Sequence, residues 1–304
     1  MKKALVLSSF ILKIIAIITM TLDHVGLIIE MSCPANMALI QLASVFRLLG
    51  RLSFPLFIFM IVEGVIHTKN IKKYFLRLGI LAAIISIFFI VIEYSSLRKQ
   101  FPIIPQFLRS GNIFLELLLA GVAVYALTQK GWKKLLILLP LGLSITSFIV
   151  KGLENSTVID IYWFPAFLTL TYDWVGIILA VLFYLSYYIA DTYISITYEQ
   201  TKLDKESWML TGNYRLLVNI ISALMLIVVG VFYYLFIYIW PKATFVNTQS
   251  AMVQLFSIIS GAFILLYNGK RGYNAKWFQI GAYIYYPAHI IILFAIFILI
   301  NGGL

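Results

Sequence analysis

Long apolar stretches run the whole length of the chain, separated by short groups of charged residues and by Pro, Gly or Asn. They cover residues 8–30, 43–66, 74–94, 111–129, 134–150, 162–196, 216–240, 250–267 and 277–300. A helix needs about 20 apolar residues to cross a bilayer, so each stretch predicts a spanning helix. The sixth is too long for one crossing, and Asp160, Pro165 and Asp173 interrupt its start. We expect a broken or re-entrant piece over 160–172 before a span at about 174–196.

Composition explains why so many stretches are apolar. Of the 304 residues, 62% are hydrophobic and only 12% are charged, and the mean hydropathy is +0.98. Soluble domains are about a quarter charged, and their interior could not hide this much apolar surface. We therefore expect an all-α polytopic membrane protein, a single domain over 1–304 with about nine to ten transmembrane helices around a polar central chamber.

The distribution of positive charge predicts the orientation. The chain has 23 Lys and Arg against 12 Asp and Glu, a net charge of +11. With the N-terminus inside, the inner segments hold Lys2, Lys3, Lys69, Lys72, Lys73, Arg77, Lys130, Lys133, Lys134, Lys202, Lys205, Arg215, Lys270, Arg271 and Lys276. The outer segments hold Arg98, Lys99, Arg109, Lys151 and Lys242. The positive-inside rule then predicts a multi-pass protein of the cell membrane with a cytoplasmic N-terminus. The positives sit in short connections without room for a duplex, so we expect no nucleic-acid partner.

Ionisable side chains inside the predicted spans are the first candidates for function, because each costs at least about 2.5–3.5 kcal/mol on insertion scales. Lys13 and His24 are eleven residues apart, which puts them on nearly the same helix face, about 16 Å apart along the axis. Arg47 and Arg51 are i,i+4 neighbours whose like charges repel. An anionic group should lie opposite them, and Asp23 is the natural candidate.

Further charged groups lie deeper in the chain. Glu63 and His67 form a second i,i+4 pair, and Pro55 can kink the helix between this pair and the two arginines. His289 lies near the middle of the last span with Tyr285 on its own face. Two more carboxylates, Glu116 and Asp173, also fall at membrane depth.

Two basic segments, 68–73 and 268–272, lie inside in this topology and contain lysines with glycine or asparagine. They suit a grip on a polyphosphate ligand such as coenzyme A, although charge that only sets topology is the alternative. The chain lacks a Walker loop and the GxSxG and HExxH motifs, and its single Cys and 3 His predict no metal site. A membrane-embedded base, charge stabilisers and an anion grip together indicate acyl transfer from a thioester.

Several motifs in order also resemble one known family. They are LKIIA at 12–16 with MTLDHVG at 20–26, FRLLGRLSFPLF at 46–57 with Glu63 and His67 following, YDWVG at 172–176, and LYNGKRG with YPAH between 266 and 289. These motifs resemble the TraX family of integral-membrane acetyltransferases, which are known for N-terminal acetylation of conjugative pilin and look related to the acyltransferase-3 group. Ala288 stands where the family pattern has Leu.

The resemblance implies an acyl-CoA-dependent acetyltransferase with acetyl-CoA as donor. It implies His24 as catalytic base, helped by Asp23, and places Lys13 near the acyl-CoA. We expect Arg47 and Arg51 to stabilise the oxyanion or bind an anionic acceptor, and Glu63 and His289 to complete the central chamber. The residues expected to hold coenzyme A phosphates are Lys13, His67, Lys69, Lys72, Lys73, Lys270 and Arg271.

Other functions remain open at this point. The acceptor amine or hydroxyl belongs to a peptide, such as the N-terminus of an exported, pilin-like or lipid-anchored protein, or to a lipid or glycan. A proton-coupled secondary transporter would also need buried Arg, Glu and His, but no internal repeat is detectable. A non-catalytic membrane assembly protein is the third hypothesis.

Overall fold

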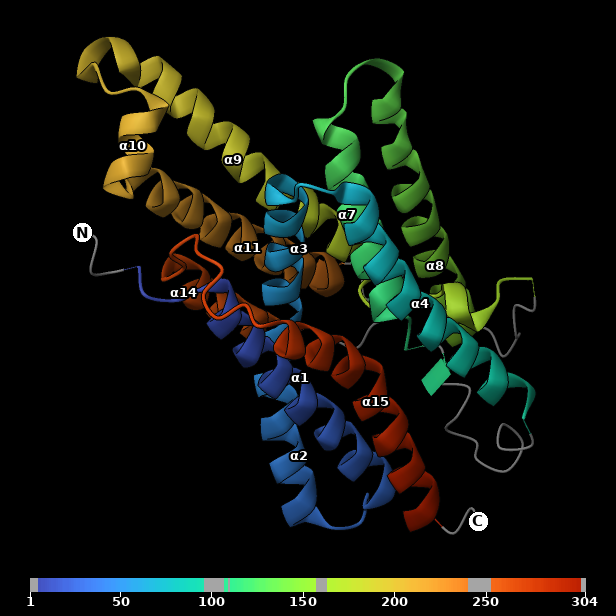
Figure 1. The fold of residues 1–304 in the computed structure, drawn as a ribbon. Coiled ribbons are helices and arrows are strands. Elements are labelled where there is room, and N and C mark those ends of the chain that lie inside the picture. The colour runs from blue at the N-terminus through green and yellow to red at the C-terminus, as the bar shows by residue number, and fades with distance from the viewer. Residues whose placement is uncertain (1–4, 96–106, 109, 157–162, 240–252, 302–304) are drawn as a thin grey trace.

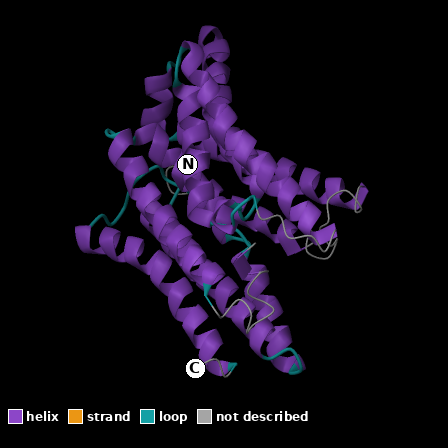
Figure 2. Cartoon of the chain, turned by 90° about the vertical axis from the view of Figure 1, so that its right-hand side faces the viewer, coloured by secondary structure: helices purple, strands orange, loops and turns teal. Residues whose placement is uncertain are grey.

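The computed structural model describes residues 5–95, 107–108, 110–156, 163–239 and 253–301. Lys2, Lys3, Arg98, Lys99, Arg109, Asp160 and Lys242, which entered the charge analysis, lie outside these residues. The described chain consists of helices joined by loops (Figures 1 and 2), and its isolated β-bridge pairs Leu7 with Tyr267.

The helices follow the apolar stretches of the sequence. In chain order they are α1 (Ser9–Ser32), α2 (Met37–Gly50), α3 (Ser53–His67), α4 (Ile71–Tyr94), α7 (Ile113–Thr128), η1 (Gly131–Ile137), α8 (Leu138–Ser156), η2 (Ala166–Leu168), α9 (Asp173–Thr201), α10 (Lys205–Thr211), α11 (Asn213–Ile239), η3 (Phe256–Ile259), α14 (Ser260–Leu265) and α15 (Lys276–Ile300). In the described part, 7 helical segments are long and apolar enough to cross a membrane, and Ile113–Thr128 and Val253–Leu265 are shorter apolar helices. The predicted all-α, multi-pass membrane architecture is confirmed.

The second apolar stretch forms two helices with a break at Arg51 and Leu52. Pro55 lacks the N–H that would donate to the carbonyl of Arg51 in a continuous helix, so the helix cannot pass through this point undisturbed. The hydroxyl of Ser53 donates to the carbonyl of Gly50 across the break at 2.8 Å. The predicted kink is therefore present, between the two arginines and the Glu63–His67 pair.

The segment before α9 is broken, as expected. Its described part forms a short 3₁₀ turn, η2, and then irregular chain up to Asp173, whose φ of +53° lies in the left-handed region. Besides the bonds within its own turn, the backbone here bonds to neighbouring helices. The N–H of Asn112 donates to the carbonyl of Thr169 at 2.7 Å, and that of Leu170 donates to the hydroxyl of Ser147 at 2.8 Å.

Helix α3 occupies the centre of the bundle and packs on α1, α7 and α9. At one end of the molecule the loop after α14 folds over the start of α1. The N–H groups of Ser9 and Phe10 donate to the carbonyls of Lys270 and Arg271 at 2.9 and 3.0 Å. The hairpin made by α9, α10 and α11 extends away from the body beside this loop (Figure 1). The fold thus fixes the late loop 268–272 against the first helix.

Candidate active site

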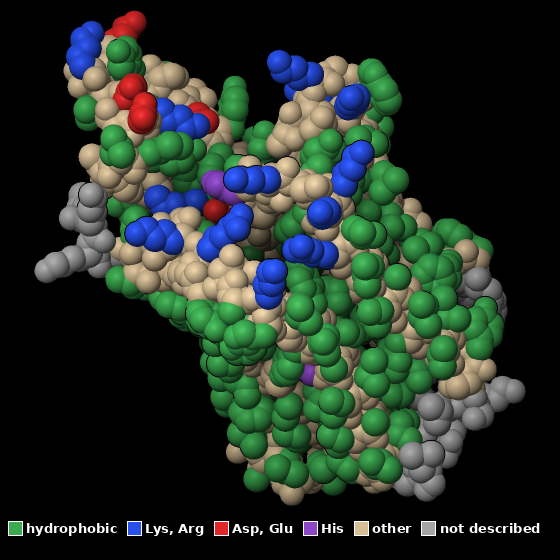
Figure 3. Space-filling view, viewed as in Figure 1, with side chains coloured by type: hydrophobic (Ala, Val, Ile, Leu, Met, Phe, Trp, Pro, Cys, Tyr) green, Lys and Arg blue, Asp and Glu red, His purple; other side chains and the backbone are tan. Residues whose placement is uncertain are grey.

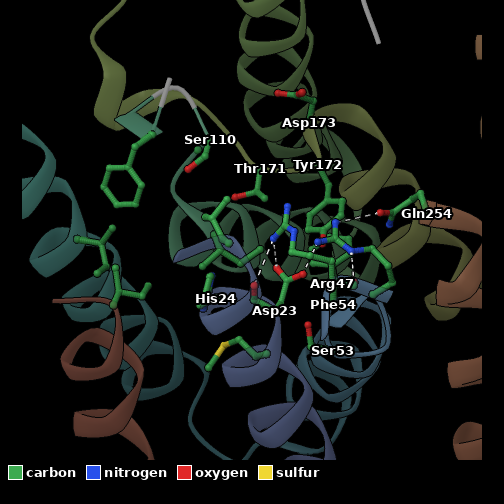
Figure 4. Close-up of a pocket in the computed structure, with 18 of the residues that line it drawn as sticks. Asp23, His24, Arg47, Ser53, Phe54, Ser110, Thr171, Tyr172, Asp173 and Gln254 are labelled. Atoms are coloured by element: carbon green, nitrogen blue, oxygen red, sulfur yellow. Dashed lines mark hydrogen bonds and ion pairs between the residues drawn. The ribbon is translucent and has the colours of Figure 1, made fainter. Parts of the chain in front are cut away.

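Asp23 lies between the two guanidinium groups, as the sequence predicted. Its Oδ2 is 2.9 Å from Nη1 of Arg47, and its Oδ1 pairs with Arg51. Gly50 permits this approach, because a Cβ there would come within 2.6 Å of the Asp23 side chain. Arg47 has a second carboxylate, Glu30, at 3.6 Å. Figure 4 shows Asp23 and Arg47 facing each other at the edge of a pocket.

His24 contacts His289, which comes from the last helix. Nδ1 of His24 and Nε2 of His289 are 3.0 Å apart, and Nδ1 of His289 is 3.0 Å from the carbonyl of Tyr285. A carbonyl can only accept, so Nδ1 of His289 carries its proton, and in the neutral ring Nε2 is then an acceptor. His24 therefore donates from Nδ1 and keeps the lone pair of Nε2. This tautomer suits a general base.

A cavity of about 500 Å³ is lined by His24 and by Asp23, Arg47 and Arg51, whereas His289 is outside its lining and reaches it only through the contact with His24. Its polar lining includes Ser110, Lys151, Thr171, Asp173 and Gln254, and Figure 4 shows Thr171 and Tyr172 close to the arginine side of the pocket. Its apolar lining comes from α1, α4 and α15 at one side and from α3, α7, α8, α9 and α11 elsewhere. Cavities of this volume hold small ligands in many proteins.

A polar group missed by the sequence analysis sits at the far side of this cavity. Lys151 was assigned to an outer connection but lies within α8, 2.5 Å from Asp173, which also accepts from Ser147 at 2.6 Å. Behind them, fully buried Glu116 accepts from the N–H of Tyr172 at 2.9 Å. The sequence indicated Glu116 and Asp173 as carboxylates at membrane depth, but it did not indicate that Lys151 is the partner of Asp173.

Glu63 does not line this cavity, so the expectation that it completes the chamber around His24 needs correction. It pairs with Arg215 at 2.9 Å and accepts from Tyr187, with Tyr267 at 3.4 Å and His67 at 3.9 Å. Glu63 lies too far along the chain to reach the cavity at His24. It is twelve residues after Arg51 at the helix break, which corresponds to about 18 Å along the helix.

The sequence analysis assigned Arg215 to an inner connection, as it assigned Lys151 to an outer one. In the structure Arg215 lies within α11 and pairs with Glu63. It lies over the rings of Tyr267 and Tyr187 at 4.9 and 5.3 Å and donates from Nε to Asn219 at 2.9 Å. Burial and the nearby carboxylate of Glu63 raise the pKa of Tyr267, which follows α14, to about 12. The i,i+4 spacing of Arg215 and Asn219 was the only signal of a shared buried face.

The residues expected to bind phosphate come from three segments. Lys13 is on α1, His67, Lys69, Lys72 and Lys73 are at the α3–α4 connection, and Lys270 and Arg271 are in the loop 268–272. That loop is held to the start of α1 by backbone hydrogen bonds. Tyr267, which precedes the loop, and Tyr187 of α9 both donate to Glu63 near the end of α3. Figure 3 shows Lys and Arg side chains gathered around a hollow, with a histidine and an acidic side chain inside it. This basic face lies on the Lys13 side of α1, away from His24.

The comparisons with known proteins agree with the sequence motifs. The family model described as "TraX protein" matches residues 8–245. A curated relative, the "Probable fimbrial assembly protein FimC, serogroup H1" of Dichelobacter nodosus, is 35% identical over 123 residues, which are 38% of this chain and 45% of that protein. The chain thus matches less than half the length of this relative. No solved structure matches the chain.

Proposed function

The chain belongs to the TraX family, and from that premise we propose that it is an integral-membrane acyltransferase. It moves an acetyl group from acetyl-CoA to an acceptor amine or hydroxyl. The observation that carries this proposal is the His24–His289 pair beside the Asp23–Arg47–Arg51 cluster, at the edge of a cavity large enough for a ligand.

His24 acts as the general base in this proposal. Its Nε2 takes the proton from the acceptor nitrogen or oxygen while that atom bonds to the thioester carbonyl carbon. The carbon–sulfur bond then breaks, and the proton passes from His24 to the leaving sulfur. His289 holds the required tautomer, because its Nε2 accepts from Nδ1 of His24. General bases of this kind contribute about 10²–10⁴-fold to a rate.

Arg47 and Arg51 stabilise the negative charge that develops on the carbonyl oxygen. Asp23 pairs with both and orients them. Asp23 and Glu30 together balance the two guanidinium groups, but Glu30 is outside the cavity lining, so guanidinium groups outnumber carboxylates at this wall. Preorganised donors in a site of low dielectric are worth about 10²–10³-fold each.

The basic face suits the phosphates of coenzyme A, which supplies the acyl group as an activated thioester. Lys69, Lys72, Lys73, Lys270 and Arg271 would hold the phosphates, with Lys13 and His67 beside them. The loop that carries Lys270 and Arg271 is fixed by backbone bonds to α1, so its charges are preorganised. Lys13 and His24 share α1, which gives the donor a route from this face to the base.

We place the basic face in the cytoplasm and the chain in the cell membrane. The single cysteine offers a direct test, because Cys33 caps the opposite end of α1. A membrane-impermeant maleimide should label Cys33 in intact cells. It should not label Lys270→Cys in a Cys33→Ser background until the cells are opened, and the reverse pattern would invert the topology.

A pilus-related role is the second candidate, favoured by the name of the relative from Dichelobacter nodosus. The acceptor would then be the amine of a pilus subunit, or the chain would assist assembly without catalysis. The catalytic and non-catalytic roles differ in one observable, the release of free CoA from acetyl-CoA.

The deciding experiment measures thermal stability and CoA release with purified protein. Acetyl-CoA should stabilise the folded state by mass action, by about 2.7 kcal/mol at a hundred times Kd. The double variant Lys270→Ala with Arg271→Ala should lose most of this shift. His24→Ala should keep the shift but lose CoA release by about 10²–10⁴-fold.

Matched variants make the result specific. Lys205→Ala removes an exposed lysine that pairs with Asp191 at 2.7 Å on the hairpin, and it should leave the acetyl-CoA shift unchanged. No shift with acetyl-CoA in folded wild-type protein would overturn the donor assignment. Undiminished CoA release by His24→Ala would remove His24 from the mechanism.

A further inference from the structure

The cavity beside His24 extends as an apolar slot along the rest of α1. Leu27, Ile28 and Met31 line it from α1, and Ile290, Leu293 and Phe294 line it from α15. Met31 is seven residues beyond His24, so the slot continues for about 10 Å from the histidine. Asp23, Arg47 and Arg51 line the cavity beside the histidine, which gives this slot a polar end at His24 and an apolar end at Met31.

Aromatic rings border the slot on the α4 side. Phe107 stacks on Phe294 with ring centroids 5.2 Å apart, and it meets Phe89 at 5.8 Å. Phe89, Phe107 and Phe294 all line the cavity. Protein interiors are normally packed to crystal density, so an apolar space of this kind signals a ligand more than a packing defect.

The direction of the slot assigns it to the acceptor. It runs from His24 toward Met31, whereas Lys13 and the basic face lie in the opposite direction along the same helix. The donor phosphates therefore occupy the other side of the histidine. An acetyl group is also far too small to require a cavity of about 500 Å³.

The chemistry of the lining separates an alkyl chain from a peptide. A peptide laid along Leu27, Ile28 and Leu293 would leave its N–H and C=O groups without hydrogen-bond partners, and each such group is unfavourable in an apolar space. An alkyl or acyl chain has no such groups and gains by burial.

We infer that the acceptor is a membrane amphiphile, whose single chain fills the slot between α1 and α15 while its amine or hydroxyl head meets His24. This inference rests on the proposed function and names the substrate class of the same site. The transfer forms the bond from the head nitrogen or oxygen to the acyl carbon, and His24 carries the proton to the leaving sulfur, as above.

Direct binding is tested without any donor. A dodecylamine with a diazirine at its chain end is photolysed with the full chain in nanodiscs, and the labelled peptides are mapped. Label should appear in 27–31 and 290–294, and dodecylamine should compete with it while butylamine does not. Label confined to lipid-facing residues, or insensitive to dodecylamine, would overturn the inference.

A pair of neighbouring variants distinguishes the slot from the lipid-facing surface. Leu293→Trp fills the slot and should reduce labelling about tenfold. Ile292→Trp adds the same ring at the same depth on a side chain that is 57% exposed, and it should leave labelling unchanged. Equal effects of the two variants would contradict a specific slot.

Transfer provides the second test. With acetyl-CoA as donor, kcat/KM for straight-chain primary amines should rise about fourfold per methylene until the slot is full. A flat series would overturn the inference and leave the proposed function standing. If longer acyl-CoAs bind progressively more tightly and displace the amine label, the slot holds the donor chain and the inference is wrong.

The two proposals fail separately. If acetyl-CoA neither binds nor is consumed while the diazirine still labels 27–31 and 290–294, the acyltransferase proposal falls and the amphiphile site stands.

Discussion

Two ion clusters of this protein are buried to a similar extent but differ in their surroundings. One joins Asp23 to Arg47 and Arg51, and the other joins Glu63 to Arg215. The side chains of Arg51 and Asp23 are 14% and 16% exposed, and those of Arg215 and Glu63 are 12% and 10% exposed. Burial alone therefore does not tell which cluster does chemistry. The difference lies in access to a cavity.

In the Glu63 cluster the charges are balanced and enclosed. Each nitrogen of the Arg215 guanidinium faces a polar group, namely Asn219, Tyr187 or Glu63. Three aromatic rings surround it. Arg215 is enclosed by these groups and does not line the cavity, so its role is to join α3, α9, α11 and the loop after α14.

In the Asp23 cluster two guanidinium groups and one carboxylate line the wall of a cavity, and the second carboxylate, Glu30, lies 3.6 Å from Arg47 outside that lining. His24 lines the same cavity, and its partner His289 lies behind it, outside the lining. Guanidinium groups with access to a ligand can respond to negative charge that appears during a reaction. The comparison indicates that access to a cavity is more informative than depth.

The largest expected effect is on catalysis by the Asp23 cluster. In the proposed reaction, Arg51→Gln should lower kcat about 10²–10³-fold with little change in KM for acetyl-CoA, because the guanidinium would act on the transition state. The measurement is steady-state CoA release by protein with an unchanged melting temperature. A change confined to KM would make Arg51 a binding group instead.

The next effect is on stability, and it belongs to the Glu63 cluster. Glu63→Ala leaves Arg215 buried without its carboxylate and should cost about 3–5 kcal/mol of unfolding free energy. Removing both charges, by Glu63→Gln with Arg215→Met, should restore much of that stability. Denaturant or thermal melts of the three proteins test this, and a double variant as unstable as Glu63→Ala would contradict a self-contained structural pair.

The smallest effect is a pH dependence from the same cluster. Because the pKa of Tyr267 is raised to about 12, the folded state holds a proton that the unfolded tyrosine loses near pH 10. Its contribution to stability is full below pH 10 and declines as pH rises toward 12. Wild-type protein should therefore lose more stability than Tyr267→Phe between pH 9 and 11. Parallel losses in the two proteins would contradict the assignment.

The sequence predicted features that depend on spacing along one helix. The i,i+4 arginines required an anion, and Asp23 is that anion. Pro55 placed the helix break to within a few residues, because a missing N–H acts on its own turn. The apolar stretches located the spans, because bilayer thickness sets their length.

Contacts between distant helices could not be predicted in the same way. His24 and His289 were both noted, yet nothing local says that helices 265 residues apart in sequence bring their rings together. The pairs Glu63–Arg215 and Lys151–Asp173 likewise depend on how helices pack. Charge counting assigned Arg215 and Lys151 to connections because each lies near the end of an apolar stretch.

The length of α9 has a consequence for the surroundings of the protein. Its 29 residues extend about 43 Å, well beyond the roughly 30 Å of a hydrocarbon core. Thr201 lies fourteen residues past Tyr187, about 21 Å above the level of the Glu63 cluster. The end of the hairpin, which is held by the Asp191–Lys205 pair, therefore projects beyond the membrane into water on the side of the basic face. An antibody raised against this end of the hairpin would report which compartment that face sees.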